Sequence, residues 1–368
     1  MYHWELPRYG VASLPDVLPS IARRLGVGDA GPLALPAAQN YVLLLVDGLG
    51  EVQLREYADR APFLAQAEKQ VLTVGVPSTT ATSLTSLGVG LAPGAHGVAG
   101  YSFRFANTVV SPLRFPKRLS GLDVQPQPTW LERLEDAGVQ VTVVTQADFV
   151  GSGLTTMALR GGRLWGFTAA PPVEKLVELA IDAVSGPGPS CCYVYEGRLD
   201  KAGHAAGVGS PKWLEMLGLA DRVARDLAAK LPADTVLLAV GDHGMVNIPL
   251  EHRLVFEQLQ TVKGWPTPPL VAGEARFRHV YVDGDADALA TALQAELGEL
   301  AEVRTRANAA AWIGPLNPKV ADRFGDVMIA LDGDHAIMTT TMPRENQIVG
   351  MHGSLTPAEI LTPLLTFA

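Results

Sequence analysis

The residues best suited to chemistry in this chain follow short apolar runs or lie in late loops. They are carboxylates, imidazoles and one hydroxyl group: Asp47, Thr80, Asp200, His204, Asp242, His243 and His352. In an open, mostly parallel sheet the ligand site lies beyond the carboxyl ends of the strands. We therefore predict that these side chains, although far apart in the sequence, converge at one edge of the fold.

The charges of this set predict a pair of divalent cations. Imidazole together with carboxylate is the ligand mixture that suits zinc, while manganese or iron at such a site is the alternative. Three aspartates plus one threonine alkoxide carry 3 + 1 = 4 negative charges, which two zinc ions would neutralise. An anionic phosphate could then approach without repulsion from the ligands. The expected cofactor is two divalent metal ions, with zinc preferred.

Thr80 could be the nucleophile of such a site. A threonine hydroxyl is a weak nucleophile until a base or a metal activates it. Two metals about 3.5–4 Å apart can hold the attacking and leaving oxygens of an in-line displacement at phosphorus. Thr80 also opens a predicted helix, whose first N–H groups favour a phosphoryl group. The set therefore predicts phosphoryl transfer.

Each of these residues also has an ordinary explanation when taken alone. Asp200 and His204 could form an ion pair at four-residue spacing. Because Gly203 lies between them, we predict a turn here instead of a regular helix. Asp47 precedes Gly48 and could simply end a strand in a turn. The metal-ligand interpretation depends on the whole set occurring in one chain.

Alternating strand and helix patterns predict an α/β fold. Strands are expected at residues 41–46, 71–76, 139–145, 191–195, 235–240, 278–282 and 326–330. Helices are expected at residues 14–25, 80–87, 129–137, 173–184, 211–230, 285–297 and 357–365. The strongest strands are apolar on both faces, which is typical of strands covered on two sides. We predict a doubly wound, mostly parallel central sheet with helices on both faces.

Residues 250–324 depart from that pattern. Two short strands flank the helix expected at 285–297, and prolines gather at Pro266, Pro268 and Pro269. We predict a small α+β insertion, or cap, within a single catalytic domain that spans residues 1–368.

Composition narrows the function classes. The chain is 48% hydrophobic and 18% charged, so it can form a large core. No apolar run approaches the ~18 residues of a membrane helix, and a net charge of −9 disfavours a binder of polymeric nucleic acid. The two cysteines, Cys191 and Cys192, are adjacent, which disfavours a disulfide framework or a cysteine zinc site. With no leader visible at its start, we expect a cytoplasmic enzyme.

Five stretches of the sequence, taken in order, resemble a known family. They are VDGLG at 46–50, PSTTATSLTSLGVGLAPGAHGV at 77–98, YEGRLDKAGHAAG at 195–207, GDHGM at 241–245 and GMHG at 350–353. Their order and spacing are similar to those of the alkaline phosphatase superfamily, in particular its nucleotide pyrophosphatase/phosphodiesterase branch. The resemblance implies an alkaline phosphatase-like fold and a two-metal hydrolase.

The resemblance also assigns roles. One metal ion would be held by Asp47, Thr80, Asp242 and His243, and the other by Asp200, His204 and His352. Alignment with the family selects Thr80 as nucleophile over Ser78 and Thr79. The branch carries an asparagine three residues after the nucleophile, where this chain has Ser83, which could donate one hydrogen bond to a phosphoryl oxygen.

The expected substrate is a small phosphodiester or pyrophosphate, for example a nucleotide derivative. No lysine or arginine occurs between Gln70 and Phe103 to balance the extra charge of a monoester. Tyr101 and Phe103 could stack on a base. Attack by Thr80 would give a covalent phosphothreonine that water then hydrolyses. The alternatives are a phosphomonoesterase or phosphonate hydrolase on the same site and, from another class, a catalytically silent metal-binding module.

Overall fold

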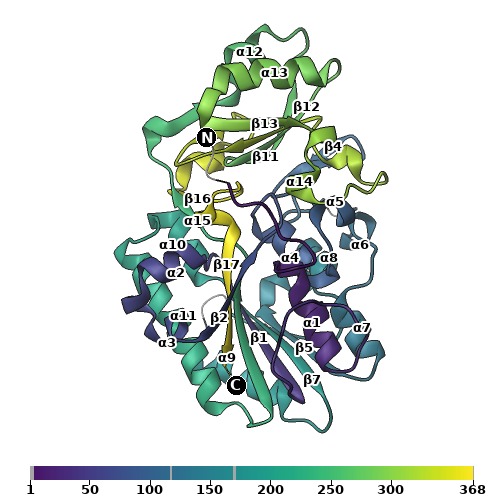
Figure 1. Cartoon of the computed structure of the whole chain (residues 1–368), viewed down its shortest axis with the longest axis vertical. Helices are drawn as coiled ribbons and strands as arrows, with labels where there is room; N and C mark the ends of the chain where they lie inside the picture. Colours follow the sequence, from purple (N-terminus) through teal and green to yellow (C-terminus); the bar gives the residue numbers. More distant parts are fainter. Residues whose placement is uncertain (1–3, 117, 169–170, 368) are drawn as a thin grey trace.

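The computed structural model describes residues 4–116, 118–168 and 171–367 (Figure 1). Its main element is a seven-stranded sheet with the strand order β2-β17-β8-β1-β7-β5-β6. In that order the strands are Glu68–Thr73, Leu361–Phe367, Thr235–Gly241, Asn40–Val46, Ser190–Glu196, Gln140–Gln146 and Arg163–Phe167. All neighbours pair in parallel except β17, which runs antiparallel to both β2 and β8. The predicted mostly parallel central sheet is confirmed.

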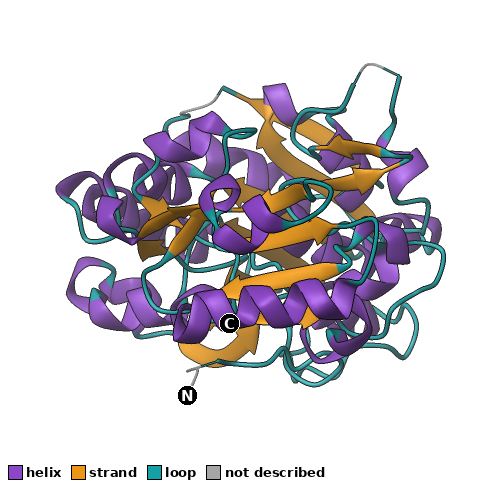
Figure 2. Cartoon of the chain, turned by 90° about the horizontal axis from the view of Figure 1, so that it is seen from above, coloured by secondary structure: helices purple, strands orange, loops and turns teal. Residues whose placement is uncertain are grey.

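Alternate residues of each central strand face opposite helical layers. On β1, Leu43 and Leu45 join one apolar cluster, whereas Val42 and Leu44 join the other. The first layer contains α1 (Val17–Arg24), α4 (Thr80–Val89), α7 (Trp130–Asp136) and α8 (Gly153–Ala158). The second contains α2 (Glu51–Glu56), α3 (Pro62–Ala65), α9 (Val173–Val184), α10 (Arg198–Ala206) and α11 (Pro211–Lys230). Helices therefore cover both faces, as Figures 1 and 2 show.

A second, four-stranded antiparallel sheet lies at the upper end of the molecule in Figure 1. Its order is β11-β12-β14-β13, with bounds Leu270–Glu274, Phe277–Tyr281, Val327–Leu331 and Ala301–Thr305. Helices α12 (Gln260–Gly264) and α13 (Ala286–Leu297) pack on it around a separate apolar core. The sheet includes β14, which lies beyond the range 250–324 proposed for the insertion.

Short elements join the two sheets. The strand pairs are β3 (Phe103–Phe105) with β4 (Thr108–Val110), β9 (Val246–Asn247) with β16 (Gly350–Met351), and β10 (Arg253–Val255) with β15 (Ala336–Met338). The short helices are α5 (Pro93–His96), α6 (Gly121–Val124), α14 (Ala310–Ile313) and α15 (Pro357–Ile360). Within the part of the chain described, no helix combines the length and apolarity needed to cross a membrane.

One predicted element is wrong. Residues 357–365 were expected to form a helix, but only the four residues of α15 are helical, and strand β17 follows. Pro363 lies inside the segment and would interrupt a helix, because it lacks an N–H and its ring clashes with the preceding turn. The segment instead inserts between β2 and β8, with Leu364 and Leu365 fully buried.

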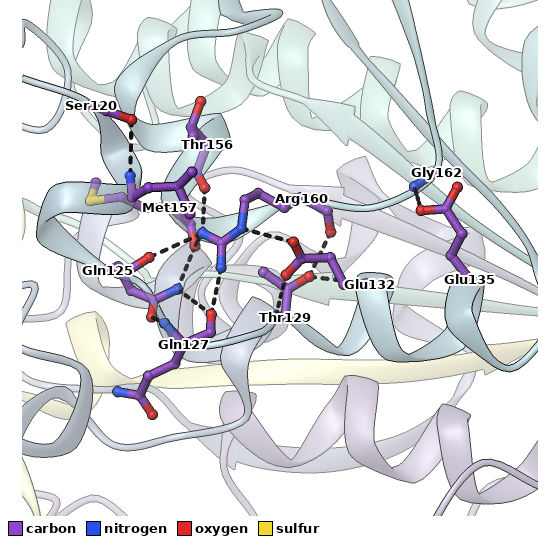
Figure 3. A network of polar contacts seen from close by, with 11 residues as sticks. Ser120, Gln125, Gln127, Thr129, Glu132, Glu135, Thr156, Met157, Arg160 and Gly162 are labelled. Carbon is purple, nitrogen blue, oxygen red and sulfur yellow. Dashed lines mark hydrogen bonds and ion pairs between the residues drawn. The ribbon is translucent and has the colours of Figure 1, made fainter.

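Arg160, just after helix α8, fixes this helix against the loop between α6 and α7. Its guanidinium donates to the carbonyl groups of Gln125 (3.1 Å), Thr156 (2.7 Å) and Gln127 (2.5 Å), and to the Glu132 carboxylate at 3.0 Å (Figure 3). The contacts join the end of α8 to the start of α7 and to the loop between α6 and α7. Helix α8 is thereby held as a wall next to α4, the helix that begins at the predicted nucleophile.

Candidate active site

A cavity of about 950 Å³ opens between the two sheets, beyond the carboxyl ends of the central strands. Thr80, Asp47, Asp200, His204 and His352 all line it. Asp242 and His243 lie directly behind them, fully buried after β8. The structure therefore brings together every residue predicted as a metal ligand.

Asp47 follows β1 and lies at the centre of this cluster. Its Oδ2 accepts a hydrogen bond from the Tyr195 hydroxyl at 2.6 Å, while its Oδ1 lies 3.4 Å from the Thr80 Oγ1. His243 Nε2 lies 3.2 Å from the same Thr80 oxygen and 3.4 Å from Asp47 Oδ1. The Thr80 hydroxyl, half-exposed at the first residue of α4, thus faces both the cavity and the buried ligands.

Asp200 and His204 lie on helix α10, not in the predicted turn, so that prediction is wrong. The four-residue spacing places both on one helix face, and His204 Nε2 lies 3.4 Å from Asp200 Oδ1. Gly203 is accepted in this helix because a side chain there would meet the Met245 sulfur at 2.4 Å. Close packing therefore outweighs the low helix propensity of glycine.

The three imidazoles of the cluster share one orientation. Nδ1 of His204, His243 and His352 lies 2.8–2.9 Å from a backbone carbonyl, of Gly350, Gly244 and Ser78 respectively. A carbonyl oxygen only accepts, so each Nδ1 carries a proton and each Nε2 is left to face the cluster. Metal-binding histidines are commonly fixed in this way.

Two other buried histidines have the reverse arrangement. His96 Nδ1 accepts the Val98 N–H at 3.1 Å, and His279 Nδ1 accepts the Gly325 N–H at 3.1 Å. Their Nε2 atoms therefore donate, to Ser86 Oγ and to the Ala99 carbonyl. Both nitrogens of each ring are therefore used by hydrogen bonds within the protein.

In the described part of the chain, the ionisable partners recorded for these carboxylates are imidazoles. Burial, followed by the charge of Asp47, raises the pKa of Asp242 to about 8, and burial also raises the pKa of Asp200. Burial acts to raise the pKa of Asp47 as well, but the hydrogen bond and charge of His243 bring it below its usual value. Although burial acts to lower the pKa of His243, the charges of Asp242 and Asp47 raise it to about 10.

This donor set fits divalent cations. Asp200 Oδ1 and Asp242 Oδ2 are buried with no hydrogen-bond partner among the described residues, and such groups are costly unless something compensates them. His352 Nε2 and His204 Nε2, both acceptors in this orientation, face each other at 3.3 Å. Two groups of ligand atoms lie within 4.8 Å of one another: Asp47, Asp242, His243 and Asp200, His243, His352.

The hydroxyl groups next to Thr80 are used elsewhere. Ser78 Oγ donates to the Ser354 carbonyl at 2.7 Å and is fully buried. Thr79 is also buried and hydrogen-bonds to Glu274. Thr80 is therefore the member of this run whose hydroxyl lies at the carboxylates.

The residues predicted to contact substrate are placed differently from one another. Tyr101 lines the cavity. Phe103 is fully buried in the main core and is not among the lining residues, because it begins strand β3 and packs inward. Ser83 is also fully buried away from the lining, and its hydroxyl has no partner among the described residues. Neither position supports the contact predicted for it.

Sequence reasoning missed several lining residues. Tyr195 was assigned only to a strand, although its position beside the predicted ligand motif at 195–207 was a usable signal. Glu274 comes from β11 of the second sheet, and burial raises its pKa to about 8. Arg344 also reaches the cavity wall. No motif marks Glu274 or Arg344, because both arrive through the packing of the second sheet.

Comparison with solved structures identifies the same architecture. Phosphonoacetate hydrolase from Sinorhizobium meliloti 1021, in complex with phosphonoformate, matches with a TM-score of 0.70 and 17% identity over 90% of each chain. The same enzyme in complex with phosphonoacetate matches with a TM-score of 0.71, again at 17% identity over 90% of each chain. A search of curated proteins finds no significant match.

The sequence itself matches a family model over most of its length. Residues 41–355 match the model described as type I phosphodiesterase / nucleotide pyrophosphatase. This range contains all five motifs on which the resemblance to the alkaline phosphatase superfamily was based, and the resemblance is confirmed. The chain belongs to the type I phosphodiesterase/nucleotide pyrophosphatase family and is a hydrolase of phosphoester bonds.

Proposed function

We propose that this protein hydrolyses a small phosphodiester or pyrophosphate through a covalent phosphothreonine at Thr80, with two divalent cations, zinc by ligand type. The observation that carries the proposal is the position of the Thr80 hydroxyl. It lies 3.4 Å from the Asp47 carboxylate and 3.2 Å from His243, and it faces the cavity at the start of α4.

The ligand groups divide between two neighbouring positions. Asp47, Asp242 and His243, with Thr80, would hold one cation, while Asp200, His204 and His352 would hold the other. His243 lies between the positions, because it belongs to both groups of ligand atoms. When bound, the cations would supply Lewis acidity for the attacking and leaving oxygens.

The chain's own groups prepare the first step. The Thr80 oxygen loses its proton and attacks phosphorus, the bond to the leaving oxygen breaks, the phosphoryl group is transferred to Thr80, and the leaving oxygen takes up the proton. The N–H groups of the first turn of α4 have no partner within the helix and point toward the reacting group. Asp47 faces the hydroxyl proton, and Tyr195 holds the other oxygen of that carboxylate in place.

The second step returns the enzyme to its starting state. Water attacks the phosphothreonine, the bond between phosphorus and Thr80 oxygen breaks, and the proton of the water returns to the hydroxyl. Each in-line displacement inverts phosphorus, so the product retains the configuration of the substrate.

The cavity favours a substrate larger than phosphate. A volume of about 950 Å³ falls in the range of a drug-sized ligand. Tyr101 and Phe149 line it together with apolar side chains such as Leu154, which suits a flat ring in the leaving group. A nucleotide derivative meets these requirements.

A phosphonate with a second acidic group is the other candidate. Arg114 and Arg344 lie on the cavity wall, and each could pair with a carboxylate. The structural neighbour carries phosphonoacetate or phosphonoformate in its two complexes, and each has a carboxylate beside phosphorus. Comparing turnover of bis-nitrophenyl phosphate, mono-nitrophenyl phosphate and phosphonoacetate separates the two classes.

The central test removes the nucleophile. Thr80→Ala should lower turnover of a diester reporter by at least roughly 10³-fold, while elemental analysis still finds the same metal content per chain as in the wild type. Thr80→Ser retains a hydroxyl and should keep measurable turnover, and acid-quenched mass spectrometry of the wild type should show the adduct. Full activity of Thr80→Ala would remove Thr80 from this role.

A further inference from the structure

A second cluster of side chains that could hold a metal ion lies beside the two-stranded sheet of β10 and β15, away from the cavity. His252 Nδ1 lies 2.8 Å from Asp334 Oδ1, and His335 Nδ1 lies 3.7 Å from the same oxygen. All three ligand atoms lie within 4.8 Å of one another. None of these residues lines the cavity or contributes to the cluster around Thr80.

Strand register explains why the two imidazoles meet. Strand β10 runs parallel to β15, with Arg253 opposite Ala336. His252 immediately precedes β10 and His335 immediately precedes β15, so the same register places them side by side. Their rings stack with centroids 4.5 Å apart and an angle of 10° between planes. The hydrogen-bonded pairing of β10 with β15 therefore fixes the relative position of the two imidazoles.

The third candidate ligand, Asp334, lies in the same turn as His335. Asp334 directly precedes His335 in the short turn between β14 and β15. The carbonyl of His335 accepts from the buried Arg276 guanidinium, which also forms an ion pair with Glu359. This contact holds the turn, and the positive charge of Arg276 is already balanced by Glu359.

The spacing of the ligand atoms suits a small divalent ion. Zinc–nitrogen and zinc–oxygen bonds of about 2.0–2.2 Å in a tetrahedral site place ligand atoms roughly 3–3.5 Å apart. The observed separations of 2.8 Å and 3.7 Å to Asp334 lie on either side of that range. The side chains are 25–48% exposed, so water can complete the coordination.

We propose that His252, Asp334 and His335 bind one divalent transition-metal ion, zinc by ligand type, outside the active site. The ion joins the residue that precedes β10 to the turn that precedes β15, at the start of the two-stranded sheet that these strands form. It acts as a structural clip on the segment that carries the cavity residues of η9 (Pro343–Gln347), which follows β15. The inference does not depend on the proposed hydrolase chemistry.

The test counts zinc on otherwise intact protein. Wild-type protein, dialysed to equilibrium against buffered zinc, should hold one more ion per chain than His335→Ala or His252→Ala. Thermal unfolding should show a zinc-dependent rise in the melting temperature that is smaller in both variants. Asp334→Asn keeps a hydrogen-bond acceptor for His252 and should weaken zinc binding at least tenfold.

Direct localisation makes the result independent of variant folding. Crystals of wild-type protein with zinc, measured at the zinc absorption edge, should show anomalous density between His252, Asp334 and His335. Equal zinc content in wild type and variants, or no density there while the cluster around Thr80 is filled, would overturn the proposal. Loss of diester turnover in Thr80→Ala has no bearing on either outcome.

Discussion

Two regions of this molecule each contain several buried ionisable side chains. In one region these side chains are fully paired, whereas in the other some carboxylate oxygens have no hydrogen-bond partner among the described residues. Where the second sheet meets α15, Arg276 donates to Glu359 through two nitrogens, at 3.0 and 2.6 Å, and both side chains are fully buried. At the ends of the central strands, Asp200 and Asp242 each leave a buried oxygen without a hydrogen-bond partner among the described residues.

The two regions differ in whether the chain itself supplies the positive charge that balances its buried carboxylates. At the junction the chain supplies both charges and saturates them, since Glu359 also accepts from the Ser354 N–H at 3.0 Å and from Thr356. At the cluster around Thr80 the described residues supply carboxylates and imidazoles. A buried anion that is not fully compensated costs several kcal/mol, which supports the proposal that this cluster binds cations from outside the chain.

Removing the cations should have the largest effect. Chelation should abolish turnover of a diester reporter, because several kcal/mol of transition-state stabilisation correspond to at least roughly 10³-fold in rate. Activity should return with added zinc in proportion to the metal bound, measured by elemental analysis. Undiminished turnover by demonstrably metal-free protein would show that the cluster around Thr80 does not need external cations.

Breaking the junction pair should be the next largest effect, and it should act on stability. Arg276→Met leaves the Glu359 carboxylate buried and unpaired, so the free energy of unfolding should fall by about 3–5 kcal/mol. Urea unfolding of the metal-loaded protein measures it. The matched double variant Arg276→Met/Glu359→Leu should recover most of the loss. A single variant as stable as the wild type would show that the junction is not sensitive to charge.

The metal-free cluster should lose stability as pH rises, by a smaller amount. The pKa of Asp242 is raised to about 8 in the fold, above the unfolded value, so the unfolded chain releases that proton first. The pKa of His243, raised to about 10, has the same sign above pH 6.5. Between pH 6.5 and 8 the free energy of unfolding should fall by up to about 1.4 kcal/mol per pH unit for each group.

That pH slope has two internal controls. His96 and His279, with pKa values lowered to about 3 and 4 by burial, are neutral in the fold throughout this window, so they oppose the slope only near pH 6.5, where the unfolded imidazoles still bind protons. Asp242→Asn should flatten the slope in metal-free protein, measured by urea unfolding at each pH. A metal-free wild type that gains stability from pH 6.5 to 8 would contradict the assignment of the unpaired charges.

Removing an exposed ion pair should have the smallest effect on the free energy of unfolding. It therefore serves as the reference for the buried charges of both regions. Lys212 and Glu215 form an ion pair at 2.9 Å with side chains 59% and 62% exposed. Lys212→Ala should change the free energy of unfolding by less than about 0.5 kcal/mol. A loss comparable to that of Arg276→Met would mean that burial is not what distinguishes the ion pairs.

Much of the main fold could be predicted from local pattern. Helices α9 and α11 have the predicted bounds, and the strongest strands lie within a residue or two of the predicted ranges. Strand β17 could not be predicted in this way, because its place between β2 and β8 comes from pairing across the whole chain. Strand β6 was also missed, since most of its residues are exposed and its apolar pattern is weak.

The same division holds for the candidate site. Residue types and order in the sequence predicted Asp47, Asp242 and His352 as neighbours, and the structure places them together. The environment of Phe103 could not be predicted, because the face of a short strand that turns inward depends on what packs against it. Glu274 and Arg344 reach the cavity from another sheet, without a local signal in the sequence.

The sequence by itself determined the ligand chemistry and the alternation of helix and strand. The carboxylates, the imidazoles and the threonine are given by residue identity. The periods that distinguish helix from strand follow from backbone geometry. Only the tertiary structure decided the orientation of each imidazole, the contact between Tyr195 and Asp47, and the pairing of His252 with His335. These depend on strand register and on backbone carbonyls far away in sequence, which local interactions do not encode.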